Sequence, residues 1–544
     1  MARQIPQGIA HAAFDAIIIG AGINGAGIAR DAAMRGLKVL LLDKGDLASG
    51  TTSWSTRLIH GGLRYLEHGE VSLVRESLRE RERLLRIAPH LVRPLPLLIP
   101  VYERARRGMS LIRAGMILYD ILSLDKSLEH HHMLSRRETL LRAPGLNTEG
   151  LRGAALYYDA QVEYAERLVL ENALAAQAHG TTVLTYARVD RIIQDAGRVR
   201  GVEFTDLLDG SAHAARAPVT LNVAGPWVDL VRSLAASTFK NRMIGGTKGS
   251  HLIVSPFPGA PLDALYVEAL EDRRPFFIIP WNKHYLIGTT DSRYEGDLDT
   301  VLADEKEIDY LIRETNRVIP DAALTRDSVL YTYSGIRPLA YREELDEEGI
   351  TRRHFVHDHA PELDGLVSIV GGKLTTYRNL AEQAVDMLFK KLGRRSPACL
   401  TARVALPGAT TDDWRAFSER FLAESPLPAL ASRRLLRIYG TRAREVLELA
   451  AEDTLLAEAF DTETGAIGAE ILFSFRREMA LTLADCLLRR TMVGMNSTVG
   501  LGADEAAAVI ARKYLGWSES RAAQEVAAYR KYIERFHPHE FVRA

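Results

Sequence analysis

The sequence has little cysteine, no excess of charge of either sign and no long apolar run. Its two cysteines, Cys399 and Cys486, are too few for a disulfide framework or a cysteine-built metal site. The 69 Lys and Arg residues nearly cancel the 70 Asp and Glu residues, so no global charge points to nucleic acid as a partner. A run of about 18 apolar residues is missing, and we therefore expect no segment that spans a bilayer.

The first 20 residues lack a basic segment followed by an uninterrupted apolar run. We therefore expect no secretory signal and place the protein in the reducing cytoplasm, with contact to a membrane surface left open. The run His130 to His132 does not predict a metal site, because three adjacent residues cannot all point to one centre on a helix or strand. We expect no bound metal.

Residues 15–43, DAIIIGAGINGAGIARDAAMRGLKVLLLD, predict a βαβ unit: an apolar run, a glycine-rich turn, a helical stretch and a second apolar run. Gly20, Gly22 and Gly25 fit the pattern G-x-G-x-x-G, and Asp43 ends the second run 23 residues after Gly20. The glycines permit a tight turn, close approach of a pyrophosphate and close helix–strand packing, and the acid suits ribose hydroxyls. A plain βαβ turn is the alternative, but this context favours a dinucleotide site.

Three further glycine motifs favour FAD over a nicotinamide cofactor. They are HGG at 60–62, NVAGPW at 222–227 and VGGKLTT at 370–376. A flavin ring lies against backbone, which requires positions without side chains far along the chain. In TRLIHGGLRYLEHG, we accordingly predict that Gly61 and Gly62 expose backbone to the ring.

The chain changes character near residue 398. Helical and strand-like segments alternate between residues 150 and 370, whereas residues 410–544 are rich in Ala, Leu, Arg and Glu at helical spacing. Residues 474–495 are interpreted as one amphipathic helix and residues 526–536 as another, both for packing. Neither carries a chemical constellation, and a homodimer contact or a docking surface stays open.

Seven motifs together resemble the FAD-dependent, aerobic-type glycerol-3-phosphate dehydrogenase family over residues 14–390. Beside the first glycine motif these are LIHGGLRYLEHGE, VAGPWV, KGSHLIV, IPW…IGTTD, YSGIRPL and VGGKLTTYRNLAE. The resemblance implies an α/β fold: a Rossmann-like FAD-binding domain of the glutathione-reductase/D-amino-acid-oxidase type over residues 1–397. A substrate domain with an antiparallel or mixed sheet interleaves with it, mainly within 70–150 and 240–355. An all-helical C-terminal domain follows over 398–544.

The resemblance implies oxidation of sn-glycerol 3-phosphate to dihydroxyacetone phosphate by hydride transfer to FAD, with electrons passed on to a quinone. A soluble oxidase that uses oxygen is one alternative. An amine or amino-acid oxidase on the same scaffold is another, and it would need a grip for a carboxylate and no phosphate site. A non-catalytic module with FAD as a structural or sensing ligand is the third.

A phosphorylated polyol needs cations for a phosphate of about −2 charge. By resemblance, the substrate-binding residues are Arg64, Tyr65, Arg352 and Lys373, mainly at the phosphate end. Arg353 is the alternative to its neighbour, because the surrounding loop EEGITRRHF is poorly patterned.

The reaction also needs a group that takes the hydroxyl proton as hydride leaves. By resemblance, Arg337 lies at the reacting hydroxyl and the flavin edge, where it would stabilise developing negative charge. His60 and His251 are the candidate proton acceptors, because the unperturbed pKa of histidine is near neutrality. The alternatives are that His60 caps a turn and that His251 is a core histidine.

The cofactor-binding residues expected from the motifs and the resemblance extend from the first strand to the last glycine motif. They are Gly20, Gly22, Asn24, Gly25, Asp43, Lys44, Thr52, Ser53, Ser55, His60, Gly61, Gly62, Leu63, Val189, Ala224, Gly225, Gly335, Gly372, Lys373, Leu374 and Thr375.

Residues 103–124, ERARRGMSLIRAGMILYDILSL, combine Arg104, Arg106, Arg107 and Arg113 with many apolar side chains. This combination is typical of an amphipathic helix at a membrane interface, and an ordinary core helix with a basic flank is the alternative. A quinone-reducing enzyme must reach the bilayer, which favours peripheral association with the inner face of the cell membrane.

Overall fold

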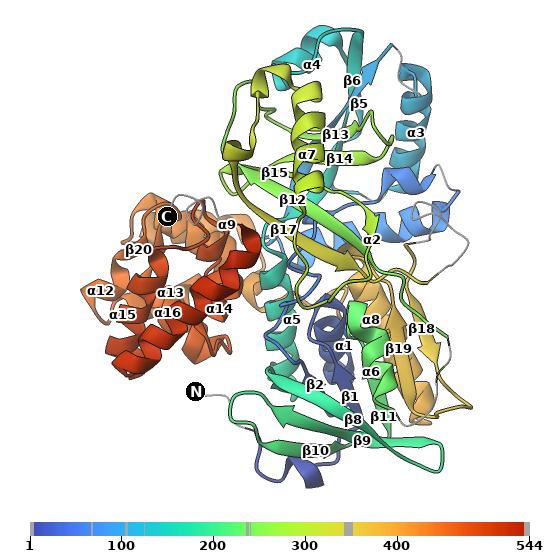
Figure 1. The fold of residues 1–544 in the computed structure, drawn as a ribbon, viewed down its shortest axis with the longest axis vertical. Helices are drawn as coiled ribbons and strands as arrows, with labels where there is room; N and C mark the ends of the chain where they lie inside the picture. The colour runs from blue at the N-terminus through green and yellow to red at the C-terminus, as the bar shows by residue number, and fades with distance from the viewer. Residues whose placement is uncertain are drawn as a thin grey trace.

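The computed structural model describes residues 5–66, 69–103, 107–124, 126–235, 239, 241–341 and 352–537. Three parts are visible in Figure 1. A sheet flanked by helices forms the lower part, a second sheet forms the upper part, and a group of helices lies to one side.

The described residues place six strands in the lower sheet, in the order β18-β19-β11-β1-β2-β7. Neighbouring strands are parallel, except that β18 runs antiparallel to β19. The strands are β1 (Ala16–Ile19), β2 (Val39–Leu42), β7 (Thr182–Leu184), β11 (Val219–Asn222), β18 (Phe355–Asp358) and β19 (Leu366–Val370).

Strands β1 and β2 are apolar at every position because both faces of the sheet are covered. On one face, Ile18 and Leu41 join the core under α1, which packs against α5 and α8. On the other face, Ile17 and Leu40 pack with Phe204 of a three-stranded sheet. The covering elements are α1 (Ile23–Met34), α5 (Ala165–Ala178), α8 (Tyr377–Lys391), β8 (Ala187–Asp195), β9 (Arg198–Asp206) and β10 (Ala212–Arg216).

The upper sheet has ten strands among the described residues, in the order β16-β12-β15-β14-β13-β4-β6-β3, with β17 paired to β12 and β5 paired to β6. The sheet is mixed: β13 runs parallel to β4, and the other strand pairs of the sheet are antiparallel. The strands are β3 (Leu58–Ile59), β4 (Val92–Tyr102), β5 (His132–Ser135), β6 (Leu151–Val162), β12 (Thr247–Val254), β13 (Ala264–Glu268), β14 (Pro275–Trp281), β15 (His284–Gly288), β16 (Ser292–Arg293) and β17 (Val329–Arg337). Strands β3 and β6 belong to this sheet as well. They lie outside the segments 70–150 and 240–355, in which the sequence analysis mainly places the substrate domain.

Four helices border the upper sheet in the described part of the chain: α2 (Val71–Ile87), α3 (Met109–Leu122), α4 (Arg136–Arg142) and α7 (Glu305–Val318). Helix α7 begins with a capping box, in which Asp304 accepts a hydrogen bond from the backbone of Glu307 and the Glu307 side chain accepts one in return. None of the helices in the described ranges is both long and apolar enough to cross a bilayer.

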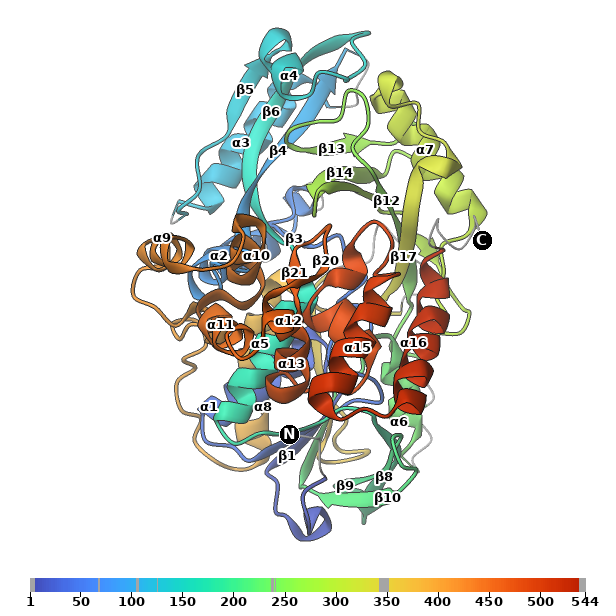
Figure 2. The ribbon, with the colours of Figure 1, turned by 90° about the vertical axis from the view of Figure 1, so that its left-hand side faces the viewer.

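The C-terminal part is mainly helical, as predicted. Figure 2 shows its helices lying across the junction between the lower and upper sheets, in front of α5. It also contains a short hairpin of β20 (Ala459–Asp461) and β21 (Ala466–Ile467). The helices are α9 (Trp414–Glu424), α10 (Ala429–Tyr439), α11 (Ala443–Ala450), α12 (Thr454–Ala457), α13 (Gly468–Arg477), α14 (Leu483–Asp485), α15 (Ala503–Leu515) and α16 (Glu519–Ile533).

The interpretation of residues 474–495 as one amphipathic helix is wrong. Helix α13 ends at Arg477, α14 starts only at Leu483, and a π-helical turn follows over Cys486–Arg490. The arginines of this turn, Arg489 and Arg490, are buried in ion pairs instead of facing solvent. Residues 526–536 are helical as predicted, within α16 and the turn after it.

Candidate active site

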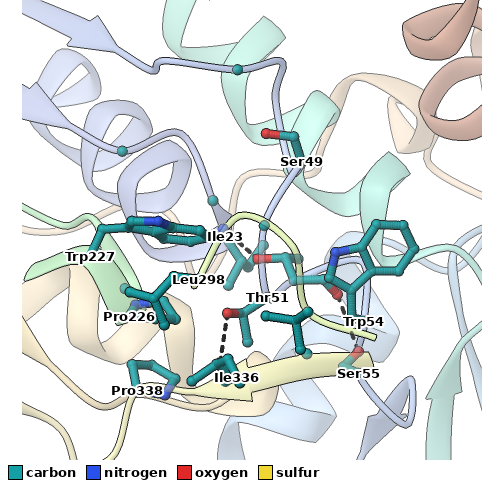
Figure 3. A pocket seen from close by; sticks show the side chains of 18 of the residues that line it. Ile23, Ser49, Thr51, Trp54, Ser55, Pro226, Trp227, Leu298, Ile336 and Pro338 are labelled. Atoms are coloured by element: carbon teal, nitrogen blue, oxygen red, sulfur yellow. Dashed lines mark hydrogen bonds between the residues drawn. The ribbon is translucent and has the colours of Figure 1, made fainter. Parts of the chain in front are cut away.

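A cavity of about 1140 Å³ lies where the carboxyl ends of the lower strands meet the upper sheet. It exceeds the range of about 300–1,000 Å³ common for small-ligand sites, which suits an extended dinucleotide. Figure 3 shows Trp227 and Trp54 on opposite sides of the view, with Thr51 between them. The Thr51 hydroxyl donates to the backbone oxygen of Ile336 at 2.7 Å, which fastens this segment to β17.

The glycine-rich turn between β1 and α1 has the conformation that a dinucleotide site requires. Gly20 has a φ of 109°, and a Cβ there would lie 2.6 Å from the backbone oxygen of Val223. A Cβ on Gly25 would lie 1.8 Å from the Gly20 oxygen, so this glycine serves the packing of helix on turn. Helix α1 begins at Ile23 and directs its positive N-terminal end toward the turn.

Asp43 fixes this turn from the end of β2. Its Oδ2 accepts the N–H of Ala21 at 2.6 Å, and its Oδ1 accepts the N–H of Gly45 at 2.8 Å. Each carboxylate oxygen has a second lone pair, so both can still accept from ribose hydroxyls. Burial raises the pKa of Asp43 from its ordinary value, although the two backbone N–H groups oppose the shift.

The last glycine motif meets the start of α1 in the cavity wall, where Nδ2 of Asn24 donates to the backbone oxygen of Gly371 at 3.4 Å. Gly372 has a φ of 105°, and a Cβ there would lie 2.7 Å from Nδ2 of Asn24. The absence of a side chain at Gly372 therefore leaves room for the Asn24 side chain in the cavity wall. The Oδ1 atom of Asn24 is buried without a hydrogen-bond partner among the described residues, and so it can accept a hydrogen bond from a ligand.

Most of the cofactor-binding residues predicted from the sequence line this one cavity. They are Gly20, Gly22, Asn24, Asp43, Lys44, Thr52, Ser55, His60, Val189, Ala224, Gly225, Gly335, Gly372, Lys373, Leu374 and Thr375. The predicted residues outside its wall are Gly25, Ser53, Gly61, Gly62 and Leu63.

Gly61 and Gly62 have a packing reason to lack side chains. A Cβ on Gly61 would lie 2.3 Å from the hydroxyl of Tyr119 and 2.6 Å from Leu78. Gly62 has a φ of 77°, and its Cβ would lie 2.1 Å from the ring of Tyr65. The space that the two glycines leave is therefore filled by protein, and their direct contact with FAD stays a prediction.

The predicted substrate residues line the cavity beside the end of β17 in the upper sheet, and this part of the cavity is called its upper end. Arg64 is the exception, because it is not part of the cavity wall. Lys373 donates to the Ser77 hydroxyl at 2.7 Å, and its Nζ lies 4.5 Å from the centre of the Tyr65 ring. Burial lowers the pKa of Lys373 to about 8. Arg352 lines the cavity, whereas Arg353 is exposed and donates to Ser72, so the geometry favours Arg352 of the two.

Arg337 ends β17 and is held by several acceptors. Its Nη1 donates to Oδ1 of Asp291 at 2.9 Å, and its Nη2 donates to Oγ1 of Thr289 at 2.9 Å. Arg352 donates to Oδ2 of the same carboxylate at 3.2 Å. Burial alone would raise the pKa of Asp291, but the two guanidinium groups outweigh it and the pKa lies below its ordinary value.

Of the two candidate histidines, His251 is buried and His60 is half-buried, and both are neutral at pH 7. Burial lowers the pKa of His60 to about 4 and lowers that of His251 well below its ordinary value. The Nε2 atom of His251 lies 2.9 Å from the Thr56 hydroxyl, and its ring packs 4.8 Å from that of Tyr333. Both histidines line the cavity.

Comparison with known proteins identifies the family. The model of FAD dependent oxidoreductases matches residues 15–378, and that of the C-terminal domain of alpha-glycerophosphate oxidase matches residues 399–522. The chain is 46% identical over 545 residues to a glycerol-3-phosphate dehydrogenase of a Synechocystis species, covering 98% of each chain. It belongs to the FAD-dependent glycerol-3-phosphate dehydrogenase family. Its cofactor is therefore FAD, and it is an oxidoreductase.

Solved structures agree with this assignment. The glycerol-3-phosphate dehydrogenase from Bacillus halodurans, complexed with FAD, superposes with a TM-score of 0.77 at 29% identity, over 97% of this chain and 96% of that one. The L-alpha-glycerophosphate oxidase from Mycoplasma pneumoniae, with FAD bound, shares the fold at a TM-score of 0.55 and 18% identity, over 73% of this chain and 99% of that one. The predicted fold class is confirmed, with a helical C-terminal domain after the FAD-binding fold.

Sequence reasoning missed three groups of residues around the cavity of this dehydrogenase. Asp291 and Thr289 stand behind the wall and hold Arg337, which lines the cavity. Both lie in the quoted motif IGTTD, where the carboxylate was the available signal. Trp54 lies in the segment after the glycine turn and packs against Phe536 with ring centres 5.2 Å apart. The third group, from the C-terminal domain, includes Tyr529 and carried no motif.

Proposed function

We propose that this enzyme oxidises sn-glycerol 3-phosphate to dihydroxyacetone phosphate and that its electrons pass to a quinone. When bound, FAD supplies the hydride acceptor of the reaction and returns the electrons one or two at a time. The residues suited to hold it are the lining glycines of the turn after β1, together with Asp43 and Gly372.

The observation that carries the proposal is the set of cations at the upper end of the cavity. Arg337, Arg352 and Lys373 line it together with the hydroxyl-bearing ring of Tyr65, and Asp291 is the carboxylate that joins the two arginines. Arginine grips phosphate oxygens as a fork, and lysine adds a point charge. Arg337, Arg352 and Lys373 line the cavity while Asp291 lies behind them, so the wall itself presents cations to a phosphate dianion.

The chemistry requires a proton to leave the substrate hydroxyl as hydride leaves the carbon that bears it. The ring nitrogens of His60 and His251 carry lone pairs at pH 7 because burial keeps both side chains neutral. Either can accept the hydroxyl proton if the substrate stacks beside it. Arg337, held by Asp291, stabilises the negative charge that develops on the substrate oxygen.

Anaerobic mixing of the purified holoenzyme with candidate substrates tests the substrate class. Glycerol 3-phosphate should bleach the visible absorption of the flavin, whereas glycine, proline and glycerol should leave it unchanged. Bleaching by an amine or amino acid alone would overturn the proposal and favour the amino-acid-oxidase alternative. A flavin that no substrate bleaches would favour a non-catalytic role.

A surface on α3 supports the quinone as acceptor and a place on the inner face of the cell membrane. Leu111, Leu118 and Ile121 follow each other at helical spacing and are 61%, 40% and 54% exposed. Leu124, just after the helix, is 76% exposed. Arg113 lies exposed on the same helix, so an apolar face and a cation suited to anionic lipid occur together.

The opposite side of α3 contributes Met116 and Tyr119 to the core, so the helix combines both roles that its sequence suggests. Arg107 forms an ion pair with Glu268 at 3.6 Å, while Arg104 and Arg106 lie outside the described residues. Turnover with a soluble quinone analogue in the absence of oxygen tests the acceptor. Turnover that depends on oxygen and not on the quinone analogue would make the enzyme an oxidase.

A further inference from the structure

The C-terminal domain contacts the loop that follows β2 through one fully buried carboxylate, that of Asp46. This residue comes three positions after Asp43, and its side chain is 0% exposed. Two positions further on, the N–H of Ala48 donates to the backbone oxygen of Ala21 at 3.1 Å, inside the glycine-rich turn. The loop over residues 43–48 therefore holds both the candidate ribose acid and the turn that receives the pyrophosphate.

Two arginines of the π-helical turn bind Asp46 from the C-terminal domain. Arg489 donates from Nε to Oδ2 at 2.6 Å. Arg490 donates from Nη1 to Oδ2 at 2.8 Å and from Nη2 to Oδ1 at 2.7 Å. Both guanidinium groups are buried, so the carboxylate and the cations compensate each other in a low-dielectric setting.

The network continues behind the loop. Arg489 also donates to Asp485 at 2.8 Å, and Asp485 accepts the hydroxyl of Tyr186 at 2.6 Å. The N–H of Tyr186 in turn donates to the backbone oxygen of Gly45 at 3.0 Å. Two carboxylates and two guanidinium groups thus join the loop, the start of β8 and the C-terminal domain in one closed, charge-balanced arrangement.

The C-terminal domain also forms part of the cavity wall itself. Its contributions come from the segment around α14 and from one side of α16 and the turn after it: Thr482, Ala484, Arg489, Gln524, Tyr529 and Phe536. The cavity is therefore incomplete without this domain, although the glycine motifs all lie in the preceding part of the chain.

We propose that Asp46, held by Arg489 and Arg490, is a positioning residue for FAD and that the helical C-terminal domain is thereby a working part of the cofactor site. The ion pairs hold the loop 43–48 against the glycine-rich turn, and loss of either partner lets the loop move away from the adenosine end. Arg490 is the more informative partner because it does not belong to the cavity wall. Its guanidinium binds Asp46 and, through Nε at 2.6 Å, the backbone oxygen of Glu478, so an effect of its substitution on FAD reaches the cavity through these groups and not by direct contact.

The test measures FAD binding to full-length apoprotein by quenching of flavin fluorescence, without any substrate. Asp46→Asn keeps the shape of the side chain and removes its charge, and Arg490→Lys keeps a charge and removes the two-pronged grip. We expect the dissociation constant of FAD to rise at least about tenfold for Asp46→Asn and about threefold for Arg490→Lys. The unfolding temperature of each apoprotein is recorded in parallel.

Glu478→Gln is the matched control. The Glu478 side chain accepts from Arg167 of α5 at 2.6 and 2.8 Å and from Arg442 at 2.6 Å. The side chains of Glu478 and Arg167 are 0% exposed, so this ion pair crosses the same boundary at the same depth. The backbone oxygen of Glu478 accepts from Arg490, and Glu478→Gln leaves that bond in place. Neither residue lines the cavity. Glu478→Gln should lower the unfolding temperature of the apoprotein as Asp46→Asn does, and should leave the FAD dissociation constant within about twofold of wild type.

Equal loss of FAD affinity in Glu478→Gln and Asp46→Asn would overturn the proposal. It would mean that both ion pairs only stabilise the contact between the domains and that neither positions FAD specifically. Unchanged FAD affinity in Arg490→Lys would overturn it as well. That variant decides the matter alone if Asp46→Asn gives no folded apoprotein.

Discussion

The Arg337 guanidinium lies 2.9 Å from the Asp291 carboxylate, whose other oxygen accepts from Arg352 at 3.2 Å. Two cations on separate segments are thus held in fixed positions by one acid. Fixed orientation matters for a grip on substrate, because hydrogen-bond donors that must reorient during the reaction lose much of their electrostatic effect. The acid also lowers the repulsion between the two guanidinium groups.

Asp291→Asn should lower kcat about 10- to 100-fold, because it leaves Arg337 without its ionic anchor and a small misplacement at the reacting atoms is costly. KM for glycerol 3-phosphate should change much less, since removing an acid leaves the phosphate site at least as cationic. Steady-state kinetics of the FAD-loaded variant measures both. A rise in KM at unchanged kcat would place Asp291 at the phosphate and not at the reacting hydroxyl.

Lys373 should give the enzyme an alkaline limit. Burial lowers its pKa to about 8, so the side chain is a cation below that pH and becomes neutral above it. Substrate phosphate is attracted only to the cation, and kcat/KM should therefore fall as the pH rises through about 8. Because bound phosphate favours the charged form, kcat itself should fall only at a higher pH.

The pH dependence of kcat/KM for Lys373→Arg provides the control, since arginine stays charged in the whole range. In this variant the decline near pH 8 should disappear. A decline that persists unchanged in Lys373→Arg would assign the alkaline limit to another group.

Features local in the sequence could be predicted, and pairings between distant segments could not. The turn from Gly20 to Gly25 follows from glycine chemistry within six positions, and the strands around it follow from their apolar runs. Arg337 and Asp291 are 46 residues apart, and only the pairing of β17 and β16 with β12 brings them together. Charge alone gave no signal for this pair among 139 charged residues (69 basic and 70 acidic).

The C-terminal domain shows the same limit. In the amphipathic helix predicted for residues 474–495, arginines belong on the polar face, because arginine is rarely buried without a partner. Arg489 and Arg490 are buried. Their partner, Asp46, lies more than 440 positions earlier in the chain. A charged residue predicts a solvent-exposed position, but one that forms an ion pair inside the protein is buried. The periodicity within residues 474–495 cannot reveal such a pair, because the partner lies in another part of the chain.

Gly62→Ala should impair substrate binding and spare the cofactor. The added Cβ would lie 2.1 Å from the Tyr65 ring, and the φ of 77° is strained for alanine, so the ring must move from its place beside Lys373. KM for glycerol 3-phosphate should rise about tenfold. The ratio of flavin to protein absorbance should stay at the wild-type value, because Gly62 does not line the cavity.

Loss of FAD from Gly62→Ala would instead support the direct backbone contact with the flavin that the motif suggests. Arg64→Ala serves as the companion variant. The Arg64→Ala protein should retain FAD whether the glycines of its motif contact the cofactor or only make room for Tyr65.

Charge on the apolar face of α3 should release the enzyme from membranes. The double variant Leu118→Asp/Ile121→Asp places two acids on this face and should abolish sedimentation with anionic vesicles, whereas wild type should sediment at low salt and less at high salt. Leu422→Asp on α9 is a matched control, because Leu422 and Leu118 are both 40% exposed. It should bind vesicles as wild type does. Turnover with a water-soluble acceptor should be equal in all three proteins, since no residue of α3 lines the cavity. Vesicle binding that survives the double variant would move the membrane contact to another surface, and with it the route by which a quinone reaches the flavin.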